Sequence, residues 1–420
     1  MRVERIADSR SAPAVLRAVA GATSRLGLPP PAALSGDWFG SRAVIAPSVA
    51  IEAVSEQDVF AVKPGTAGVH VGGGWVGYLA YPDPGADEAA PRVPTAAGGW
   101  TDDVLRQDAD GVWWYENLSG ATMPGWLVDA LATSPAPAPW QVEWTAPDRD
   151  VHHAGVLACL EEIRAGEVYQ ACVCTQFVGT LRGAPVDFFA DGVARTSPAR
   201  AAFVAGDWGA VASLSPELFL RRVGETVTSS PIKGTMPLDR PPAALRTSVK
   251  DVAENVMIVD LVRNDLSRIA VTGSVTVPEL LAVRRAPGVW HLVSTVSARV
   301  PVDVPMSRVV EATFPPASVT GTPKARARDL LSTWEPRDRG IYCGTVGFAS
   351  PLAGTELNVA IRTVEFDAAG RAVLGVGGGI TADSDPAAEW QECLDKAAAI
   401  VGVTRSADAT HATQVVAPAR

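Results

Sequence analysis

Apolar and polar residues alternate along the chain with two different periods. Residues 151–165 are predicted to form an amphipathic helix. Their apolar members Val156, Leu160 and Ile163 recur at the spacing of one helical face. Shorter runs typical of strands occur at residues 42–51, 112–115, 171–177, 209–213 and 217–223. No repeat of 20–50 residues is visible, so the pattern indicates a globular protein of mixed secondary structure.

A second segment with helical periodicity, residues 249–262, carries acids among its apolar residues. Ile258 and Leu261 lie on one face of this predicted helix. Asp251 and Glu254 fall at the head of the same face. A carboxylate in such a position must be desolvated, paired with a cation or bound to a metal.

A third helical segment, residues 387–401, has two faces. The apolar face carries Trp390, Leu394, Ala397 and Val401. The charged face carries Glu389, Glu392 and Lys396. Taken alone, the charged face fits a solvated helix with a Glu392–Lys396 pair four residues apart, and a ligand site is the alternative.

Segments rich in proline and glycine predict the linkers and loops of the chain. The run Thr-Ser-Pro-Ala-Pro-Ala-Pro at 133–139 is typical of an extended linker. We therefore expect an N-terminal region of residues 1–145 and a larger core region of residues 146–405. The small, polar residues 406–420 are predicted to be a disordered tail. Residues 82–99, rich in Pro, Gly, Asp and Ala, are predicted to be an exposed loop.

The composition is that of a well-packed protein, with 47% hydrophobic and 20% charged residues. No apolar run approaches the ~18 residues of a membrane span, and the net charge of −10 disfavours nucleic acid as a partner. The five cysteines show no zinc-binding spacing, so we expect reduced thiols in a cytoplasmic protein. Residues 71–81 combine glycines with aromatic residues and predict a close-packed strand rather than a phosphate-binding loop.

Candidate chemistry begins at Lys233, which stands between Ile232 and Gly234. A lysine in an apolar setting can act as a nucleophile when it is desolvated, and glycine allows a ligand to approach closely. A surface lysine on a turn is the alternative, because lysine is almost never buried unless it is paired.

Three further segments carry anion-binding chemistry. Residues 318–324 (Ser-Val-Thr-Gly-Thr-Pro-Lys) precede a predicted helix whose first amides can hold a carboxylate. Residues 375–380 are predicted to follow a strand, either as a glycine-rich amide nest or as a plain turn. Arg362 ends an apolar strand and suits bidentate capture of a carboxylate, or an ordinary ion pair. With the paired acids, these features fit a small dianion held partly through a hard divalent cation.

The order of these motifs resembles the chorismate-utilising enzymes, the family of anthranilate synthase component I. The motifs that carry the resemblance are residues 215–217, 231–235, 250–255, 260–265, 291–294, 320–324, 361–363 and 377–384, followed by Glu389 and Glu392. The resemblance covers residues 150–403 strongly and the first 145 residues through 73–78. It implies an α+β fold in which two antiparallel β-sheets face one another, with helices outside and the site in the cleft between them.

Two positions indicate a branch of this family. Gln170 stands where water-adding members carry a lysine base, and Lys233 stands where anthranilate synthases carry alanine. Both are similar to the aminodeoxychorismate synthase branch, which serves para-aminobenzoate and folate biosynthesis. That branch replaces the C4 hydroxyl of chorismate by an amino group. The resemblance implies that Lys233 attacks C2 while Glu217 protonates the departing hydroxyl. Ammonia then adds at C4, and the lysine is expelled.

The same resemblance implies the ligands of this site. Mg²⁺ would be bound by Glu254, Glu389 and Glu392 and would in turn bind the ring carboxylate of chorismate. Arg362 would hold the enolpyruvyl carboxylate. The other expected substrate contacts are Gly234, Thr235, His291, Ser318, Thr320, Gly377, Gly378, Gly379 and Lys396. For His291, packing ahead of a strand and proton transfer remain alternatives.

Several residues depart from the family pattern, and near residues 197–200 the usual Pro-Tyr pair is absent. Pro316 and Ala317 stand where the family usually has two glycines, so the loop that follows can differ in shape. Phe348 replaces a frequent tyrosine and Cys172 a frequent asparagine. None of them removes a proposed catalytic group, but together they leave room for an altered specificity.

Ammonia is expected from a separate glutamine amidotransferase subunit, because no cysteine stands in a nucleophile-elbow setting. One alternative product is anthranilate or 2-amino-2-deoxyisochorismate, against which Lys233 argues. An alternative of another class is a non-catalytic, chorismate-binding regulatory subunit. The complete set of acids, lysine and arginine argues against that role.

Overall fold

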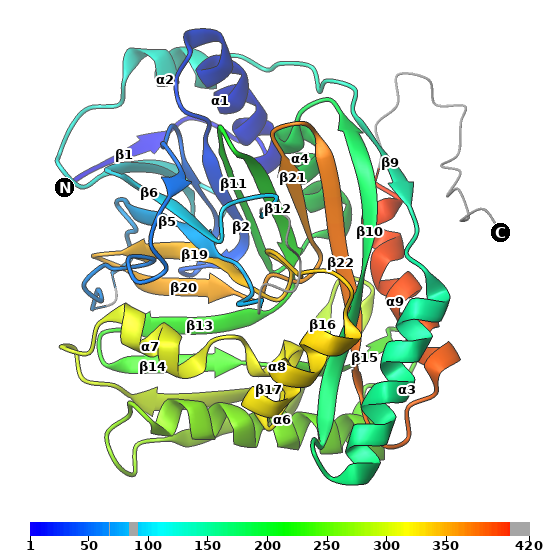
Figure 1. Cartoon of the computed structure of the whole chain (residues 1–420). Helices are drawn as coiled ribbons and strands as arrows, with labels where there is room; N and C mark the ends of the chain where they lie inside the picture. The colour runs from blue at the N-terminus through cyan, green and yellow to red at the C-terminus, as the bar shows by residue number, and fades with distance from the viewer. Residues whose placement is uncertain (67, 84–90, 404–420) are drawn as a thin grey trace.

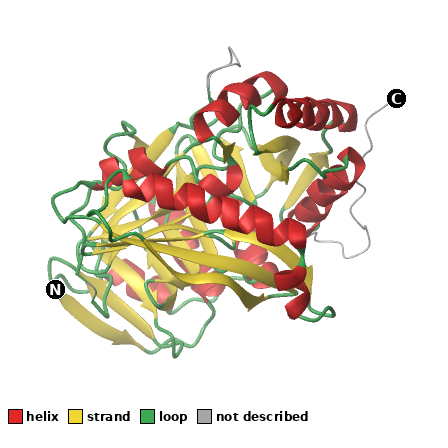
Figure 2. Ribbon diagram, turned by 90° about the horizontal axis from the view of Figure 1, so that it is seen from below, coloured by secondary structure: helices red, strands yellow, loops and turns green. Residues whose placement is uncertain are grey.

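Two β-sheets pack face to face, and helices cover their outer sides (Figure 1, Figure 2). The computed structural model describes residues 1–66, 68–83 and 91–403. The strand pairs of both sheets are antiparallel, which confirms the predicted α+β architecture.

The larger sheet has twelve strands. In spatial order they are β1 (Arg2–Ile6), β8 (Trp113–Asn117), β7 (Asp103–Gln107), β3 (Ser41–Ala46), β2 (Ala32–Trp38), β11 (Arg200–Gly206), β12 (Gly209–Ser215), β21 (Thr363–Asp367), β22 (Arg371–Ile380), β10 (Gln170–Arg182) and β18 (Gly321–Thr322), with β9 (Gln141–Thr145) also paired to β10. The N-terminal strands β1–β3, β7 and β8 therefore form one side of this sheet, and β11 and β12 join them to the C-terminal strands β21 and β22.

The smaller sheet has ten strands. In spatial order they are β15 (Ile232–Pro237), β17 (Val289–Arg299), β14 (Thr226–Ser230), β13 (Leu218–Val223), β20 (Gly354–Asn358), β19 (Thr345–Ser350), β5 (Gly74–Leu79), β6 (Ala96–Thr101) and β4 (Glu52–Ala53), with β16 (Thr276–Ala286) paired to β17. The region before residue 145 thus supplies strands to both sheets rather than forming a sheet of its own.

Helices lie outside the sheets and around one end of them. They are α1 (Ala12–Leu26), α2 (Gly125–Leu131), α3 (Arg149–Ala165), α4 (Pro185–Thr196), α5 (Ala243–Thr247), α6 (Val249–Ser267), α7 (Met306–Thr313), α8 (Lys324–Trp334) and α9 (Pro386–Val401), with a short 3₁₀ turn, η1 (Ala317–Val319). Figure 1 shows α1, α2 and α4 at one end of the larger sheet, α3 and α9 along its side, and α6 beneath the smaller sheet. The predicted helix at 151–165 is confirmed as α3.

The long strand β10 shows how the two faces of the larger sheet differ. Neighbouring residues of a strand point to opposite faces. Cys172 and Cys174 join the apolar cluster shared with the smaller sheet. Ala171 and Val173 join the cluster formed with α3 and α8. Both faces of β10 are therefore buried, which explains its nearly continuous apolar sequence.

The buried face of α9 is rotated from the predicted one. The residues that face the core are Glu389, Cys393, Ala397, Ile400 and Val401. Trp390 and Leu394, predicted to lie in the core, are only partly buried. Ala397 and Val401 are buried as predicted, whereas in the first turns Glu389 and Cys393 take the buried positions instead of Trp390 and Leu394.

Some predicted boundaries are also wrong. The strand predicted at 42–51 ends at Ala46, as β3. Part of the loop predicted at 82–99 is β6, which begins at Ala96; residues 84–90 lie outside the described part of the chain. The glycine-rich segment at 71–81 does contain a close-packed strand, β5. A side-chain carbon on Gly77 would lie 2.2 Å from the carbonyl oxygen of Ala97 on the neighbouring strand.

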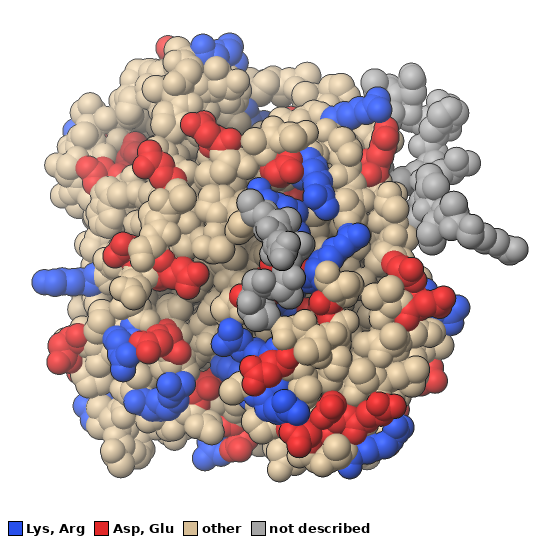
Figure 3. Space-filling model, viewed as in Figure 1, with Lys and Arg blue, Asp and Glu red and all other residues tan. Residues whose placement is uncertain are grey.

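Residues 133–139 form an irregular, exposed connection between α2 and β9. The predicted tail, residues 406–420, lies outside the described residues. No helix in the described ranges is long and apolar enough to cross a membrane. On the face drawn in Figure 3, acidic and basic side chains are interspersed.

Candidate active site

The candidate site lies where the start of β10, the end of β22 and the strand β15 approach one another. Gly379, near the end of β22, marks the meeting point. A side-chain carbon placed there would lie 3.1 Å from Lys233 Nζ, 3.6 Å from Gln170 Oε1 and 3.6 Å from Glu254 Oε2. The glycine therefore leaves space bordered by a lysine, an amide and a carboxylate from three different elements.

Gly378 faces the other side of the same strand. A carbon placed on it would lie 2.9 Å from Glu389 Oε2, 3.8 Å from Glu392 Oε1 and 3.9 Å from Lys396 Nζ. The prediction of an amide nest or a plain turn at 375–380 is wrong, because these residues end β22 and pair with β10. The glycine run instead allows close approach on both faces of a strand.

Lys233 is largely shielded from solvent, with its side chain 12% exposed. It lies in β15, where pairing with β17 is irregular. The next residue, Gly234, has a φ of +92°, and a side-chain carbon on it would lie 3.0 Å from Asp251 Cβ of α6. Lys233 Nζ lies 3.9 Å from Glu254 Oε2. The alternative of an exposed surface lysine therefore does not apply.

Glu217 directly precedes β13 and is buried, with 3% of its surface exposed. The backbone N–H of Ile232 donates to its Oε1 at 3.4 Å. Burial raises the pKa of Glu217 to about 7, although the Ser318 hydroxyl and the charge of Lys233 act in the opposite direction. A carboxyl group with this pKa can both give and take a proton at neutral pH.

Helix α6 is fixed against the smaller sheet by Asn255, which is buried. Its Nδ2 donates to the carbonyl oxygen of Leu292 at 3.2 Å, and its Oδ1 accepts from Ser294 Oγ at 2.5 Å. Because Asn255 follows Glu254 in the helix, these bonds hold the Glu254 carboxylate in place beside Lys233.

The three predicted magnesium ligands are Glu254, Glu389 and Glu392, and Lys250 lies among them. No three metal-binding side chains of the described residues stand close enough to hold an ion. Lys250 Nζ lies 3.9 Å from Glu254 Oε1 and 3.3 Å from Glu389 Oε1. Its ammonium group thus lies close to both carboxylates. The other oxygen of Glu389, Oε2, is buried and lacks a hydrogen-bond partner among the described residues.

The chemistry of these carboxylates suits a hard divalent cation, but their present spacing does not, so the three side chains would have to move together around the ion. Binding would require the Lys250 ammonium to withdraw. Burial raises the pKa of Glu254, while the charges of Lys233 and Lys250 oppose that shift. For Glu392, burial acts to raise the pKa, but Lys396 outweighs it and lowers the pKa.

Lys396 links α9 to the glycine run. Its Nζ donates to the carbonyl oxygen of Gly377 at 2.7 Å and lies 2.6 Å from Glu392 Oε1. The Glu392–Lys396 pair considered for this helix is therefore present. The Glu392 side chain is 47% exposed and Glu389 is buried, so one turn of α9 presents one exposed and one buried acid.

Arg362 directly precedes β21 and has a φ of +53°. Burial lowers its pKa, against the influence of Tyr342 and Glu392. Its guanidinium makes no hydrogen bond or ion pair with another described side chain, which leaves it available for an anion. His291 Nδ1 lies 2.9 Å from Thr235 Oγ1. Burial, followed by the charge of Arg362, lowers the pKa of His291 to about 4, so this imidazole is neutral at pH 7.

Hydrogen bonds fix the position of the loop that contains Ser318 and Thr320. Thr320 is buried, and its Oγ1 donates to the carbonyl oxygen of Pro316 at 3.0 Å. Lys324 Nζ donates to Asp265 Oδ2 of α6 at 2.6 Å. The loop beside Glu217 and the helix that carries Glu254 are therefore tied to each other at their far ends.

Two buried residues near the site were not predicted. Tyr342 stands close enough to influence Arg362, and its ring fills the space that a side chain on Gly375 would need. Arg339 donates to the carbonyl oxygens of Val319 and Cys172. Neither residue carries a distinctive local pattern in the sequence that would have indicated it.

The residues that depart from the family pattern have different surroundings. Cys172 lies on the same face of β10 as Gln170 and is buried. Phe348 packs edge-on against Phe39, with ring centroids 6.1 Å apart, in the apolar cluster between the sheets. Pro316 and Ala317 form the start of the η1 turn that carries Ser318.

Three comparisons with known proteins bear on this site. Residues 46–402 match a family described as chorismate binding enzyme. Aminodeoxychorismate synthase component 1 of Klebsiella aerogenes is 41% identical over 241 residues, which are 56% of this chain and 53% of that protein. An anthranilate synthase component I-like protein of Synechocystis is 32% identical over 352 residues, 78% of this chain and 72% of that protein. The chain thus spans about half the length of the component 1 relatives of Klebsiella and Escherichia coli.

The fold is shared with a solved structure of anthranilate synthase component I from Streptococcus pneumoniae. That comparison has a TM-score of 0.68 at 24% sequence identity, and it covers 89% of this chain and 90% of the other.

Proposed function

Because this chain belongs to the chorismate binding enzyme family, we propose that it is the synthase component of an aminodeoxychorismate synthase. It would convert chorismate and ammonia to 4-amino-4-deoxychorismate. The observation that carries the proposal is the position of Lys233, whose Nζ borders the same space as Gln170 and Glu254. A lysine side chain in that space can reach a ring bound beside the glycines of β22.

The chemistry proceeds in two displacements. The neutral amine of Lys233 forms a bond to C2, the ring double bonds shift, and the C4–O bond breaks. Glu217 gives its proton to the departing hydroxyl, which leaves as water. Ammonia then attacks C4, the double bonds shift back, and the C2–N bond breaks. The added nitrogen returns a proton to Glu217. The pKa of about 7 for Glu217 suits both transfers.

Gln170 supports ammonia rather than water as the entering group. Its Oε1 is buried and has no hydrogen-bond partner among the described residues. A free carbonyl oxygen can accept a hydrogen bond from ammonia, and it cannot act as the base that a water molecule needs. The ammonia is proposed to come from a separate glutamine amidotransferase, as the word component in the relatives' names suggests.

Mg²⁺ is proposed to bind Glu254, Glu389 and Glu392 and to neutralise the ring carboxylate of chorismate. Arg362 would pair with the enolpyruvyl carboxylate as a planar fork. His291, neutral at pH 7, would offer a hydrogen bond rather than a charge.

Product identification tests the proposal. The purified chain is incubated with chorismate, ammonium and Mg²⁺, and the product is identified by mass and fluorescence. We expect 4-amino-4-deoxychorismate. Fluorescent anthranilate, or 2-amino-2-deoxyisochorismate, would assign the chain to another branch of the family. No turnover with ammonium or with a glutamine amidotransferase would favour a chorismate-binding regulatory subunit.

A further inference from the structure

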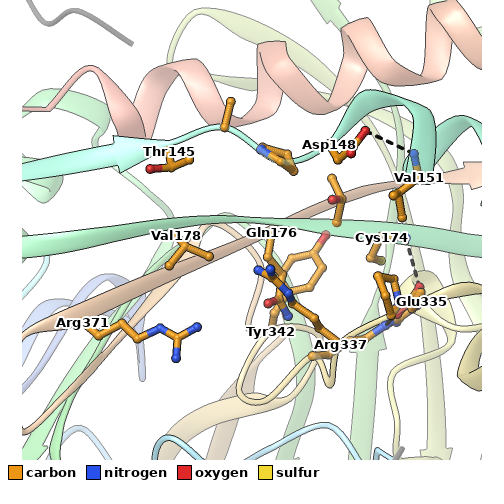
Figure 4. A pocket seen from close by; sticks show the side chains of 15 residues that line it. Thr145, Asp148, Val151, Cys174, Gln176, Val178, Glu335, Arg337, Tyr342 and Arg371 are labelled. Atoms are coloured by element: carbon orange, nitrogen blue, oxygen red, sulfur yellow. Dashed lines mark hydrogen bonds and ion pairs between the residues drawn. The ribbon is translucent and has the colours of Figure 1, made fainter. Parts of the chain in front are cut away.

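A large cavity lies beside β10, separate from the space around Gly379. Its volume is about 620 Å³, which is enough for a small organic molecule. Figure 4 shows β10 crossing this cavity, with Gln176 and Val178 on the strand and Tyr342 nearby. The cavity is lined on other sides by the loop before α3 and by residues 335–339. None of the residues assigned above to chorismate, Lys233 or the acids lines it.

The lining combines apolar walls with three arginines, of which Arg339 is paired with Glu335. Val151 and Val178 contribute apolar surface, and Arg337 and Arg371 enter from different elements (Figure 4). Neither guanidinium has an ion pair among the described residues. A protein of net charge −10 that places two unpaired arginines at one cavity creates a local preference for an anion.

The acids at the cavity are already engaged. Asp148 caps α3 by accepting from the backbone N–H of Asp150 at 2.8 Å. Glu335 lies 2.6 Å from Arg339 and accepts from the backbone N–H of Cys174 at 3.0 Å. Arg339 thus neutralises Glu335, while Asp148 keeps its charge, so the two unpaired arginines outnumber the one unpaired acid at the cavity.

Two residues that line the cavity also contact elements that form the candidate active site. Tyr342 lines the cavity, and its ring fills the space beside Gly375 of β22, the strand that ends at the candidate site. Arg339, another lining residue, donates to the carbonyl oxygen of Val319 in the η1 turn and to that of Cys172 in β10. A ligand that moved either side chain would therefore act on the Ser318 turn or on β22.

We propose that this cavity is a second binding site, for a small carboxylate with an aromatic body. Arg337 and Arg371 bind the carboxylate, and the valines and Tyr342 contact the ring. Occupation of the site alters turnover through Tyr342 and Arg339. The effect on turnover rests on the proposed function, whereas binding does not.

The test uses a matched pair of probes, 2-naphthoate and its neutral analogue 2-naphthamide, in calorimetric titrations of the whole protein. We expect one site for the carboxylate and at least about tenfold weaker binding of the amide, because hydrogen bonds to charged groups are the strong ones. The double variant Arg337→Ala/Arg371→Ala should lose at least about tenfold in affinity for 2-naphthoate. Arg5→Ala, which removes an exposed arginine on β1, is the matched control and should bind like the wild type.

Turnover of chorismate is then measured at saturating 2-naphthoate. We expect a changed kcat with an unchanged KM in the wild type, and no effect in the double variant, whose basal turnover stays normal. Equal binding of acid and amide, or undiminished binding by the double variant, would overturn the site. Competition with chorismate would place the probe in the chorismate site instead and would also overturn it. Binding without any change in turnover would refute the coupling alone.

Discussion

The candidate active site has an inner side with Glu217 and Lys233 and an outer side with Glu392 and Lys250. The two sides shift the pKa of a glutamate in opposite directions. On the inner side, Glu217 is buried, and its pKa is raised to about 7. On the outer side, Glu392 is 47% exposed, and Lys396 lowers its pKa. One carboxyl group is suited to carrying a proton, and the other to remaining charged beside a cation. The proposed mechanism accordingly assigns proton transfer to the inner side and cation binding to the outer side.

The two lysines beside Glu254 also differ in their exposure to solvent and in their ion pairs. Lys233 on the inner side is 12% exposed, and its one described ion-pair distance, to Glu254 Oε2, is 3.9 Å. Lys250 on the outer side is 47% exposed and lies within 4 Å of both Glu254 and Glu389. The inner lysine is placed beside the proposed ring site, and the outer lysine balances the acids.

The largest effect is expected for Lys233→Ala. Losing the attacking amine should lower the rate of amination by at least about 10³-fold, as removal of a covalent nucleophile does elsewhere. Chorismate binding, measured by calorimetry, should be retained. Lys63→Ala removes an exposed lysine and should leave the rate unchanged. Wild-type turnover in Lys233→Ala would show that the covalent role is wrong.

Glu217→Gln should lower kcat by about 10²- to 10⁴-fold, because the amide can neither give nor take the proton. In the wild type, kcat/KM should fall as the pH rises through about 7, where the acid form of Glu217 disappears. A pH–rate profile from 5.5 to 8.5 measures both effects. If the residual activity of Glu217→Gln kept the same fall near pH 7, another group would be responsible.

The same substitution has an opposite effect on stability. The pKa of Glu217 is raised from 4.5 to about 7 by folding, so the folded protein binds more protons between these values. Its contribution to stability is complete below about pH 4.5 and is lost as the pH rises through about 7. Glu217→Gln should therefore gain stability relative to the wild type between pH 5 and pH 8, by up to about 3 kcal/mol. Denaturant unfolding at the two pH values measures this; a difference that does not change with pH would contradict the shift.

A smaller effect is expected for Lys250→Met on the outer side. Removing the ammonium group frees Glu254 and Glu389 from two partly exposed ion pairs, worth about 1 kcal/mol together. The affinity for Mg²⁺ should therefore rise by about fivefold in a calorimetric titration. Lys63→Met is the control. Weaker Mg²⁺ binding in Lys250→Met would mean that the lysine supports the cation site rather than competing with it.

The sequence predicted the elements whose periodicity is strong, and it failed where function alters the pattern. Helix α3 follows its apolar spacing closely. Helix α9 does not, because Glu389 is buried at a position where a core residue was expected. The glycines of 375–380 were predicted to form a nest or turn, since nothing in this segment alone shows that it pairs with β10. Nor does it show that side chains from other elements fill the space beside its glycines.

The sequence motifs identified the residues of the candidate site, but they did not predict how these residues lie relative to one another. That Gly379 faces Lys233 while Gly378 faces Glu389 follows from strand alternation only once the register with β10 is known. The position of Lys250 near Glu254 and Glu389 depends on where the fold places α6 relative to α9. Such long-range geometry is set by tertiary contacts rather than by local sequence.

The most direct test of the covalent role of Lys233 omits ammonia. The wild-type protein is mixed with chorismate and Mg²⁺, quenched rapidly and analysed by peptide mass spectrometry. The account predicts that the peptide containing Lys233 gains the mass of chorismate less one water, and that added ammonium discharges this adduct. An unmodified Lys233 in a protein that still aminates chorismate when ammonium is added would contradict it.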